Sequence, residues 1–341
     1  MKSKVIAKKT NNHDRVEPPV QEIKKAIESS RHVLVATHVD PDGDAIGTQL
    51  AFGAYLENMG KKVSLLRESD IPEKYLFLPG VETILTPGVV GKQLDVDLAV
   101  IFECPNMDRL GAVKQYLKPD LKTIHIDHHR DSTIFADINW IDITSSSVGE
   151  MVWSYFKKVG YRITPDVAEL LYTAVLTDTG RFRYGSTTET TMCCAGDLIS
   201  SGAQPQKICD LVYYSMAPEA MKLLGKVLNG VEFHNGGRIC LLTLTKQMLA
   251  ETGAKESDSE GLVDHTLFNR GVVAGALLKE MDADHTRVSF RSNNHIDVSA
   301  IAARYGGGGH YNASGCTLSM SIEDARREVI RLLTEADNGR D

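Results

Sequence analysis

The sequence predicts an α/β protein with two domains, a larger parallel sheet in the N-terminal half and a smaller sheet in the C-terminal half. In the first half, short apolar segments alternate with helical patterns. This alternation is typical of right-handed βαβ units, whose helices cover both faces of the sheet. In the second half, several strand-like segments are closed by an amphipathic helix. Three strand segments of the first half run directly into acidic and histidine side chains.

The expected elements of the first half are ordered as strand, helix and further strands before a run of helices. The strand segments are rich in Val, Ile and Leu, and they cover residues 33–37, 61–66, 98–102 and 123–126. The helical segments, with apolar residues at helical spacing, cover residues 45–60, 147–159, 165–176 and 187–201. The sequence Ser-Ser-Gly-Ala-Gln-Pro at residues 200–205 should end the last of these helices.

The second half begins with a helix near Met221. Its strand candidates are residues 238–244, 271–279, 287–292 and 315–319, and its later helices are 297–305 and 322–336. We therefore expect a loose N-terminal tail at residues 1–19, a first domain at 20–201, a connecting segment at 202–219 and a second domain at 220–341.

Oxygen and imidazole groups follow three strands of the first domain and one helix. In a parallel sheet the carboxyl ends of the strands face one crevice, so these groups can converge there. They are His38, Asp40, Asp42 and Asp44 after the first strand, Glu103 after 98–102, Asp127, His128 and His129 after 123–126, and Asp178 at the end of a helix.

Each of these patches has an ordinary explanation when taken alone. Pro41-Asp42-Gly43 is typical of a turn, and a histidine pair is more often a surface or capping feature than a ligand set. Their repetition at successive strand ends favours a metal centre, because so many carboxylates would repel one another in a pocket without a cation. The donors are carboxylates and imidazoles without thiolate, which favours Mn²⁺ over a structural Zn²⁺. Mg²⁺, Co²⁺ and Fe²⁺ would also fit and are the alternatives to Mn²⁺.

The number of donors exceeds the need of one ion. We therefore expect two divalent cations roughly 3.5 to 4 Å apart, an arrangement that serves in-line displacement at phosphorus. The chemistry that this predicts is phosphoester hydrolysis by an activated water.

The motifs resemble those of the DHH/DHHA1 phosphoesterases, and within them the NrnA-like branch of oligoribonucleases and pAp phosphatases. The resemblance runs from about residue 20 to the C-terminus and depends on four motifs in the same order. They are HVDPDGD at 38–44, DHH at 127–129, TDTG at 177–180 and GGGGH at 306–310. It implies a DHH domain followed by a mixed-sheet DHHA1 domain, with the active site in the cleft between them.

The resemblance also implies a role for each ligand. One ion would be held by His38 and Asp42, the other by Asp44, His128 and Asp178, and the acid of the second motif would bridge both. Glu103 stands where the family usually has Asp, so metal separation and metal preference can differ here. Asp108 is a rival for this bridging role, against a plain turn or capping role.

His129 and Asp127 are expected to differ in role from His128. Adjacent side chains on an extended strand point in opposite directions, so His128 and His129 should not bind one ion together. The resemblance places His129 against the substrate phosphate and Asp127 behind an imidazole that it orients. The alternative for His129 is a simple hydrogen bond to the backbone.

The second domain carries the expected grip on substrate. Arg291 and Ser292 end a strand pattern, and Gly306, Gly307, Gly308, Gly309 and His310 follow a helical run. An arginine offers a bidentate fork to phosphate, and consecutive glycines allow close approach of backbone N–H groups. A flexible linker is the ordinary explanation of such glycines. In DHHA1 domains the matching motif binds nucleotide.

Composition restricts the partners. The chain has 38 Lys and Arg against 45 Asp and Glu, a net charge of −7, which does not suit long nucleic acid. Short single-stranded RNA or a 3′-phosphorylated nucleotide fits better. No apolar run approaches the roughly 20 residues of a membrane span, and the N-terminal segment lacks a signal-peptide pattern, so we expect a cytoplasmic protein without a membrane partner. Members of the family are often homodimers.

The six cysteines form no CxxC pair or framework spacing, so we expect most of them to be buried apolar residues. Cys104 next to Glu103 is also a candidate sensor of oxidation.

The sequence thus predicts hydrolysis of short RNA (nanoRNA) to mononucleotides, removal of the 3′-phosphate from pAp, or both. Two alternatives remain open. A pyrophosphatase or polyphosphatase of the same superfamily would use the same ligands on inorganic substrates, and a nucleotide-binding sensor could have lost turnover through Glu103.

Overall fold

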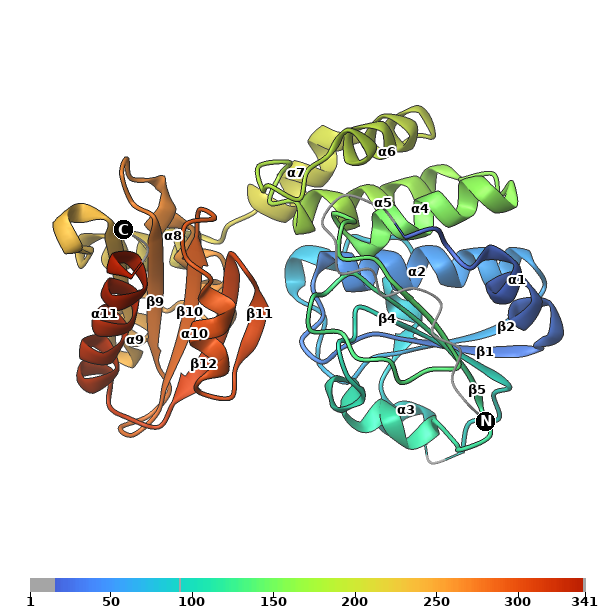
Figure 1. Cartoon of the computed structure of the whole chain (residues 1–341), viewed down its shortest axis with the longest axis horizontal. Coiled ribbons are helices and arrows are strands. Elements are labelled where there is room, and N and C mark those ends of the chain that lie inside the picture. Colours follow the sequence, from blue (N-terminus) through green and yellow to red (C-terminus); the bar gives the residue numbers. More distant parts are fainter. Residues whose placement is uncertain (1–15, 92, 340–341) are drawn as a thin grey trace. The chain divides into compact units, whose positions relative to one another are not determined.

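The computed structural model describes residues 16–91 and 93–339 of the chain. It divides into two compact units, Met1–Ser215 and Met216–Asp341 (Figure 1). Most of the expected N-terminal tail, residues 1–15, lies outside the described residues. Val16 is buried against the core of the first unit, and the indole Nε1 of Trp140 donates to its carbonyl at 3.4 Å. The end of the expected tail is therefore part of the packed structure.

The N-terminal unit contains a six-stranded sheet in the order β3-β2-β1-β4-β5-β6, with all pairs parallel. Its strands are β1 (His32–Ala36), β2 (Lys62–Leu66), β3 (Ile84–Leu85), β4 (Leu98–Phe102), β5 (Lys122–Asp127) and β6 (Ile138–Ile141). The direction of strand addition reverses between β1 and β4. In such a sheet, ligands bind at this switch point, outside the carboxyl ends of the strands.

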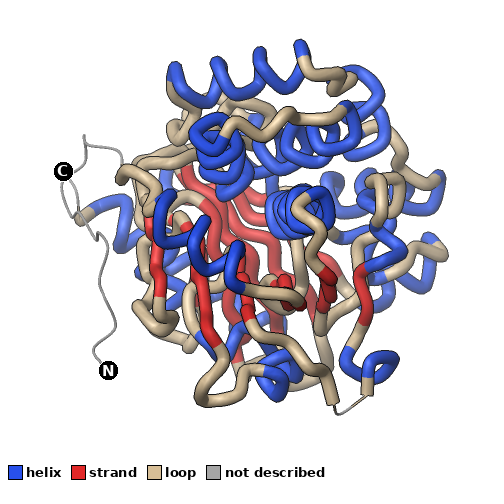
Figure 2. The backbone as a smooth tube through the Cα atoms, turned by 90° about the vertical axis from the view of Figure 1, so that its right-hand side faces the viewer, coloured by secondary structure: helices blue, strands red, loops and turns tan. Residues whose placement is uncertain are grey.

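Helices lie on both sides of the strands (Figure 2). The α-helices are α1 (Val20–Ser29), α2 (Gly43–Asn58), α3 (Pro87–Val90), α4 (Val148–Val159), α5 (Pro165–Asp178), α6 (Glu189–Ser200) and α7 (Pro205–Tyr213). Three 3₁₀ helices, η1 (Glu73–Tyr75), η2 (Val81–Thr83) and η3 (Met107–Tyr116), complete the unit.

Strand β1 is buried on both faces, as the continuous apolar pattern predicted. Val33 and Val35 belong to the core with α2, α4 and α5, whereas Leu34 and Ala36 belong to a second core with η3. This alternation follows from the period of two along a strand. Because both faces are covered, the strands are fixed and their carboxyl ends become a rigid base for the side chains that follow.

The expected strands and helices of the first half occur close to their predicted positions. Short elements were not predicted, among them α1, α3, β3 and β6. The segment expected to connect the domains contains α7, whose Ile208 and Val212 are buried in the N-terminal core. Pro205 occupies the first turn of α7, where its missing N–H costs nothing, so it begins a helix as well as following one.

The C-terminal unit contains a six-stranded mixed sheet in the order β11-β12-β10-β9-β8-β7, as expected. Only β8 and β9 pair in parallel among its described strands. The strands are β7 (Glu232–His234), β8 (Ile239–Leu244), β9 (Ala274–Glu280), β10 (Thr286–Ser292), β11 (Gly308–His310) and β12 (Ala313–Leu318). The α-helices are α8 (Pro218–Asn229), α9 (Lys246–Thr252), α10 (Val298–Ala303) and α11 (Ile322–Asn338). The 3₁₀ helices are η4 (Asn235–Gly237), η5 (Glu256–Ser259) and η6 (Leu262–Phe268).

Helices also cover both faces of this second sheet. Val288 and Phe290 of β10 pack in one core with α10 and α11, whereas Leu277 of β9 packs in another with α8 and η6. None of the described helices, in either unit, is both long and apolar enough to cross a membrane.

The carboxylate of Asp337 connects α11 to the turn between β7 and β8. It is 2% exposed and accepts from Arg238 Nε and Nη2, each at 2.7 Å, and from Asn235 Nδ2 at 2.8 Å. The hydrogen bond from Arg238 holds the pKa of the Asp337 carboxyl below its usual range, although burial opposes this. Its ionised form therefore stabilises the folded unit above the carboxyl's unfolded pKa.

We expect Asp337→Asn to destabilise the C-terminal unit by about 2 kcal/mol at pH 7, because the guanidinium of Arg238 loses its negatively charged partner. Amide hydrogen exchange in α11 should become faster in the variant. The difference in unfolding free energy between the variant and wild type should persist at pH 5. It should shrink as the pH falls below about 4 and passes through the lowered pKa of Asp337 in the folded protein, where the wild-type carboxylate is protonated. An unchanged exchange rate in α11 would show that this contact does not hold the helix.

Candidate metal centre

Carboxylates and imidazoles from three strand ends meet at the switch point of the N-terminal sheet. The described residues of this unit form three groups of potential metal ligands. In each group, one ligand atom of every member lies within 4.8 Å of those of the others. The groups are His38 with Asp42 and Glu103, Asp44 with Glu103 and His128, and Asp127 with Glu103 and His129. Glu103 belongs to all three groups. Most of the residues expected to converge therefore lie together, with Glu103 common to every group. Asp178 contacts the cluster through His128, at 3.4 Å, whereas Asp40 is exposed and belongs to none of these groups.

Glu103 is the first residue after β4, and its backbone has φ of +57°. This left-handed conformation is uncommon for a residue with a side chain and is often found at functional sites. The side chain is 1% exposed. Its Oε1 lies 3.3 Å from His128 Nε2 but is not aligned for a hydrogen bond, and it accepts none from the residues that the structure describes. A buried carboxylate oxygen without a donor fits a metal ligand.

Asp44 is fully buried in the first turn of α2. Its Oδ2 accepts from the backbone N–H of Val148 at 2.7 Å, and its Oδ1 accepts from Gly149 at 2.8 Å and from the hydroxyl of Thr48 at 3.1 Å. Val148 begins α4, so the positive end of that helix faces the carboxylate. These donors fix the orientation of Asp44 toward the group with Glu103.

His38 and Asp42 lie on the loop between β1 and α2. The Nδ1 of His38 lies 2.6 Å from the carbonyl oxygen of Val39, and a proton on Nδ1 would leave Nε2 as a lone-pair donor. Asp42 caps α2 by accepting from the N–H of Ala45 at 3.0 Å through Oδ1. The N-cap role thus occupies one oxygen of Asp42, and the loop places both side chains beside Glu103.

His128 is oriented in the same manner. Its Nδ1 lies 3.1 Å from the carbonyl oxygen of Ser145, and its Nε2 lies 3.4 Å from Oδ2 of Asp178, the last residue of α5. The carboxylate of Glu150 accepts from the hydroxyls of Ser146 at 2.5 Å and Ser145 at 3.4 Å. This buried network behind His128 holds its ring in place, as the neighbours of metal ligands usually do.

Asp127 receives hydrogen bonds from several sides. Its Oδ1 lies 2.8 Å from Nδ1 of His129 and accepts from the N–H of His128 at 2.8 Å, while Ser132 donates to Oδ2. His125 lies 3.5 Å from the same Oδ2. This geometry matches the orienting role expected for Asp127.

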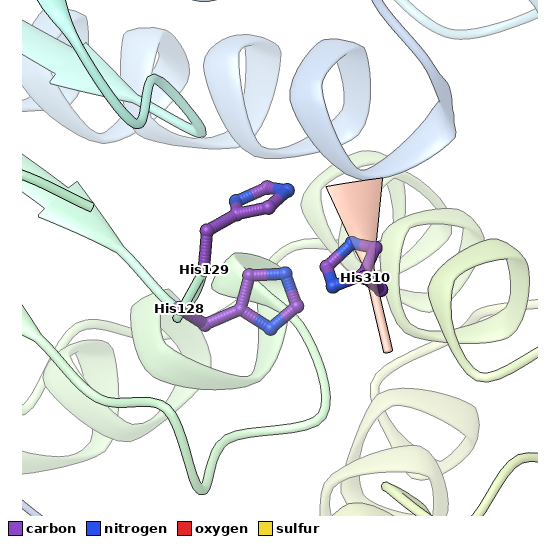
Figure 3. A group of neighbouring side chains, drawn as sticks. All are labelled: His128, His129 and His310. Atoms are coloured by element: carbon purple, nitrogen blue, oxygen red, sulfur yellow. The ribbon is translucent and has the colours of Figure 1, made fainter. Parts of the chain in front are cut away.

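The prediction that the side chains of His128 and His129 point in opposite directions was wrong. Their ring centroids are 5.0 Å apart at an interplanar angle of 75°, and Figure 3 shows both rings beyond the end of β5. The alternation of side chains applies only within an extended strand, and β5 ends at Asp127.

The pKa values of the carboxyls reflect their crowding. Burial raises the pKa of Glu103 well above its usual range, and the charges of Asp44 and Asp42 raise it further. Burial likewise raises the pKa of Asp44 and that of Asp178, the latter to about 7. Since a bound cation would favour the ionised forms, this donor set fits divalent metal ions.

Asp127 and His129 behave oppositely, as an ion pair. Burial would raise the pKa of the Asp127 carboxyl, but hydrogen bonds from His125 and His129 outweigh it and hold the pKa well below its usual range. Burial would lower the pKa of His129, but the hydrogen bond and charge of Asp127 raise it to about 9. His129 is therefore an imidazolium at neutral pH in the metal-free protein.

Two neighbours of Glu103 are not part of the cluster. The side chain of Asp108 is 89% exposed and accepts from Lys114 Nζ at 2.9 Å. Asp108 thus lies outside the ligand groups found among the described residues, and its exposure and its pairing with Lys114 favour the alternative of a plain surface role over that of a rival ligand. Cys104 is buried, and burial raises the pKa of its thiol to about 12, which favours the buried apolar role over that of an oxidation sensor.

In the C-terminal unit, Arg291 and Ser292 end β10, as predicted. Nε of Arg291 donates to Oδ1 of Asp264 at 2.8 Å, so part of its guanidinium is already paired. The hydroxyl of Ser292 is buried and donates to the carbonyl of Ile296 at 2.6 Å. The contacts of Ser292 are thus internal to the unit and support a structural role.

The glycine run is an ordered edge of the sheet and not a linker. Gly308, Gly309 and His310 form β11, paired with β12. A Cβ on Gly307 would lie 2.1 Å from the carbonyl oxygen of Gly315, and one on Gly309 would lie 2.5 Å from that of Ala313. Only glycine permits this approach of the two strands. Figure 3 also labels His310, the last residue of β11.

Sequence reasoning missed the residues that support the ligands. The network of Ser145, Ser146 and Glu150 is completed by Thr191, whose hydroxyl donates to Glu150 at 2.7 Å. In sequence this stretch is an ordinary helix start, and Ser147 indeed caps α4. A signal was available only in Glu150 itself, an acid on the face of a helix that is otherwise buried.

We expect Glu103→Gln to weaken Mn²⁺ binding by about 100-fold or more, because it removes the carboxylate common to all three groups. The metal-free variant should be at least as stable as wild type, since a crowded buried carboxyl is lost. At 100 times its Kd, Mn²⁺ should stabilise wild type by about 2.7 kcal/mol and the variant by far less at the same concentration. Thermal unfolding with and without Mn²⁺ measures both effects.

Asp108→Asn is the matched control, because it removes an exposed carboxylate outside the cluster. It should keep the full Mn²⁺-dependent stabilisation. If Asp108→Asn lost this stabilisation and Glu103→Gln kept it, the bridging role would belong to Asp108.

Comparison with known proteins identifies the family. A model of the DHH family, N-terminal domain, matches residues 32–175, and a model of the DHHA1 domain matches residues 237–336. The bifunctional oligoribonuclease and PAP phosphatase NrnA of Thermus thermophilus is 31% identical to this chain over 93% of each protein. The protein of the same name from Bacillus subtilis is 30% identical over 89% of this chain and 94% of its own length.

A solved structure agrees with these sequence matches. The crystal structure of an exopolyphosphatase-related protein from Bacteroides fragilis superimposes with a TM-score of 0.88 at 26% identity, covering 94% of this chain and 96% of that one. The order of the two matched domains is also the order of the two compact units. The chain therefore belongs to the DHH/DHHA1 phosphoesterase family, in the branch that includes the NrnA proteins.

Proposed function

We propose that this protein is a two-metal phosphoesterase that hydrolyses short RNA oligonucleotides to mononucleotides and removes the 3′-phosphate of pAp. The observation that carries the proposal is the convergence of three ligand groups on Glu103 at the switch point of the parallel sheet. The names of the relatives from Thermus thermophilus and Bacillus subtilis support this choice of substrates.

The proposed ligands of the two ions come from the four motifs. His38 and Asp42 would hold one ion, while Asp44, His128 and Asp178 would hold the other and Glu103 would bridge them. Oxygen and imidazole donors without thiolate favour Mn²⁺, with Mg²⁺ or Co²⁺ as alternatives. Such ions supply an acidified water as nucleophile and compensate negative charge on the phosphate.

His129 is proposed to contact the phosphate. Its imidazolium, held at Nδ1 by Asp127 at 2.8 Å, can donate from Nε2 to a non-bridging phosphate oxygen. A preoriented donor of this kind stabilises the charge that develops in the transition state. Asp127 acts through His129, by fixing its orientation and its protonated form.

The C-terminal unit is proposed to hold the neighbouring nucleotide. Arg291, the glycines of residues 306–309 and His310 would contact it, with Ser292 supporting the end of β10. A pocket for a few nucleotides suits a chain whose net charge is −7, because it needs only local positive charge.

A product-resolved assay with Mn²⁺ tests the function. The substrates are pAp, RNAs of about two to ten nucleotides, and pyrophosphate with polyphosphate as the inorganic alternative. We expect AMP and phosphate from pAp and mononucleotides from the short RNAs. Turnover of the inorganic substrates alone would contradict the proposal. Tight pAp binding without release of phosphate would instead indicate a nucleotide sensor.

We expect Asp42→Ala and Asp178→Ala to fold normally but to lose about 10³-fold or more in kcat/KM, since each removes a proposed ligand. Circular dichroism and Mn²⁺ titration of the same samples separate loss of ligand from loss of fold. Full activity in either variant would remove that residue from the centre.

Asp127→Asn should lower the pKa of His129 in the metal-free protein from about 9 to its ordinary value or below, because the carboxylate that raises it is gone while burial remains. Titration of the imidazole by NMR measures this change. With Mn²⁺ bound, kcat should fall while Mn²⁺ affinity stays near that of wild type. A parallel loss of Mn²⁺ binding would make Asp127 a ligand and not an orienting residue.

A further inference from the structure

Arg109 is a cation beside the metal centre to which neither the motifs nor the proposed mechanism gives a role. It lies in η3, and its side chain is exposed. Its Nη2 is 3.4 Å from Nδ1 of His38 and 3.4 Å from the carbonyl oxygen of Val39. Both contacts are long for hydrogen bonds, and they involve only one of the guanidinium nitrogens.

The charge of Arg109 is not compensated within the described residues. No carboxylate oxygen among them lies within 4.0 Å of its guanidinium nitrogens, whereas several other arginines are paired at shorter distances. Arg291, the arginine expected to grip substrate, is one of the paired ones, at 2.8 Å from Asp264. Arg109 thus has donors to offer to an anion at the mouth of the centre.

The backbone around Arg109 is fixed to the loop that carries His38. The carbonyl of Arg109 accepts from the N–H of Val39 at 2.7 Å, and the side chain of Asn106 accepts from the N–H of Arg109 at 3.3 Å. Gly111 has φ of +56°, and a Cβ there would lie 3.0 Å from Val39 Cγ1. This close packing fixes the backbone of Arg109 beside the loop that carries His38.

We propose that Arg109 is a substrate-binding residue that contacts the non-bridging oxygens of the phosphate under attack, beside His38 and Asp42, which would hold one of the ions. This inference rests on the proposed function and adds a residue to it. Arginine suits the role because its planar fork can bind two phosphate oxygens at once and stays charged. The centre contains five carboxylates, which would repel a phosphate bound there, and a cation without a carboxylate partner offsets that repulsion.

Arg109→Gln tests the proposal, with Arg109→Lys as the conservative variant. In saturating Mn²⁺ we expect kcat/KM for pAp to fall by about 10- to 100-fold in Arg109→Gln, the loss of a charge-assisted contact. Arg109→Lys should recover part of it, since an ammonium keeps the charge but not the fork. Binding of Mn²⁺ alone should remain within about threefold of wild type, because Arg109 is not a ligand.

Binding of AMP and of inorganic phosphate to the Mn²⁺-loaded protein, measured by calorimetry, gives a readout that does not depend on turnover. Arg109→Gln should weaken both by about the same 10- to 100-fold. If wild type proves inactive on pAp and RNA, the proposed function fails, but this measurement still decides the role of Arg109. Unchanged anion binding in Arg109→Gln would overturn the inference, and so would a loss of Mn²⁺ binding.

Arg31→Ala is the matched control. Arg31 is an exposed arginine of the same unit, 94% exposed, and it precedes β1 at the opposite end of the strand from the centre. The Arg31→Ala substitution removes the same positive charge from the protein without changing a residue of the candidate metal centre. A loss of anion affinity equal to that of Arg109→Gln would show that net charge, and not a contact at the centre, is responsible.

Discussion

Repulsion among buried carboxylates is the constraint on which the rest of the N-terminal unit depends. Asp44, Glu103 and Asp178 lie in one region where burial raises the pKa of each. Asp44 is partly compensated by two amide donors from the start of α4, but Oε1 of Glu103 has no donor among the described residues. Protonation or divalent cations can relieve this crowding, and the cations do so while leaving every carboxylate ionised for chemistry.

The surrounding structure fixes each ligand through a separate contact. The carbonyls of Val39 and Ser145 lie at the Nδ1 atoms of two imidazoles, helix starts orient Asp42 and Asp44, and the last turn of α5 presents Asp178. Strands β1 and β4 behind these contacts are buried on both faces and do not depend on the candidate ligands for their packing. The expectation that single candidate ligands can be replaced without loss of the fold follows from this separation.

The sequence was sufficient to bring the candidate ligands together because they follow strand ends, and a parallel sheet brings those ends to one edge. It was insufficient where the backbone leaves regular structure. The directions of His128 and His129 depend on the point where β5 ends, which alternation does not fix, and β11 resembles a linker because glycine carries no pattern. The hydrogen bond from Thr191 to Glu150 joins residues 41 positions apart, and no local motif indicates it.

The left-handed backbone of Glu103 lowers the stability of the fold at a residue whose carboxylate is proposed to be needed for activity. Conformations of this kind cost of order 1–3 kcal/mol when the residue is not glycine. Glycine or asparagine would relieve that strain and remove a crowded charge in the same step. A laboratory selection for heat resistance alone would therefore tend to enrich such replacements and yield robust but inert descendants.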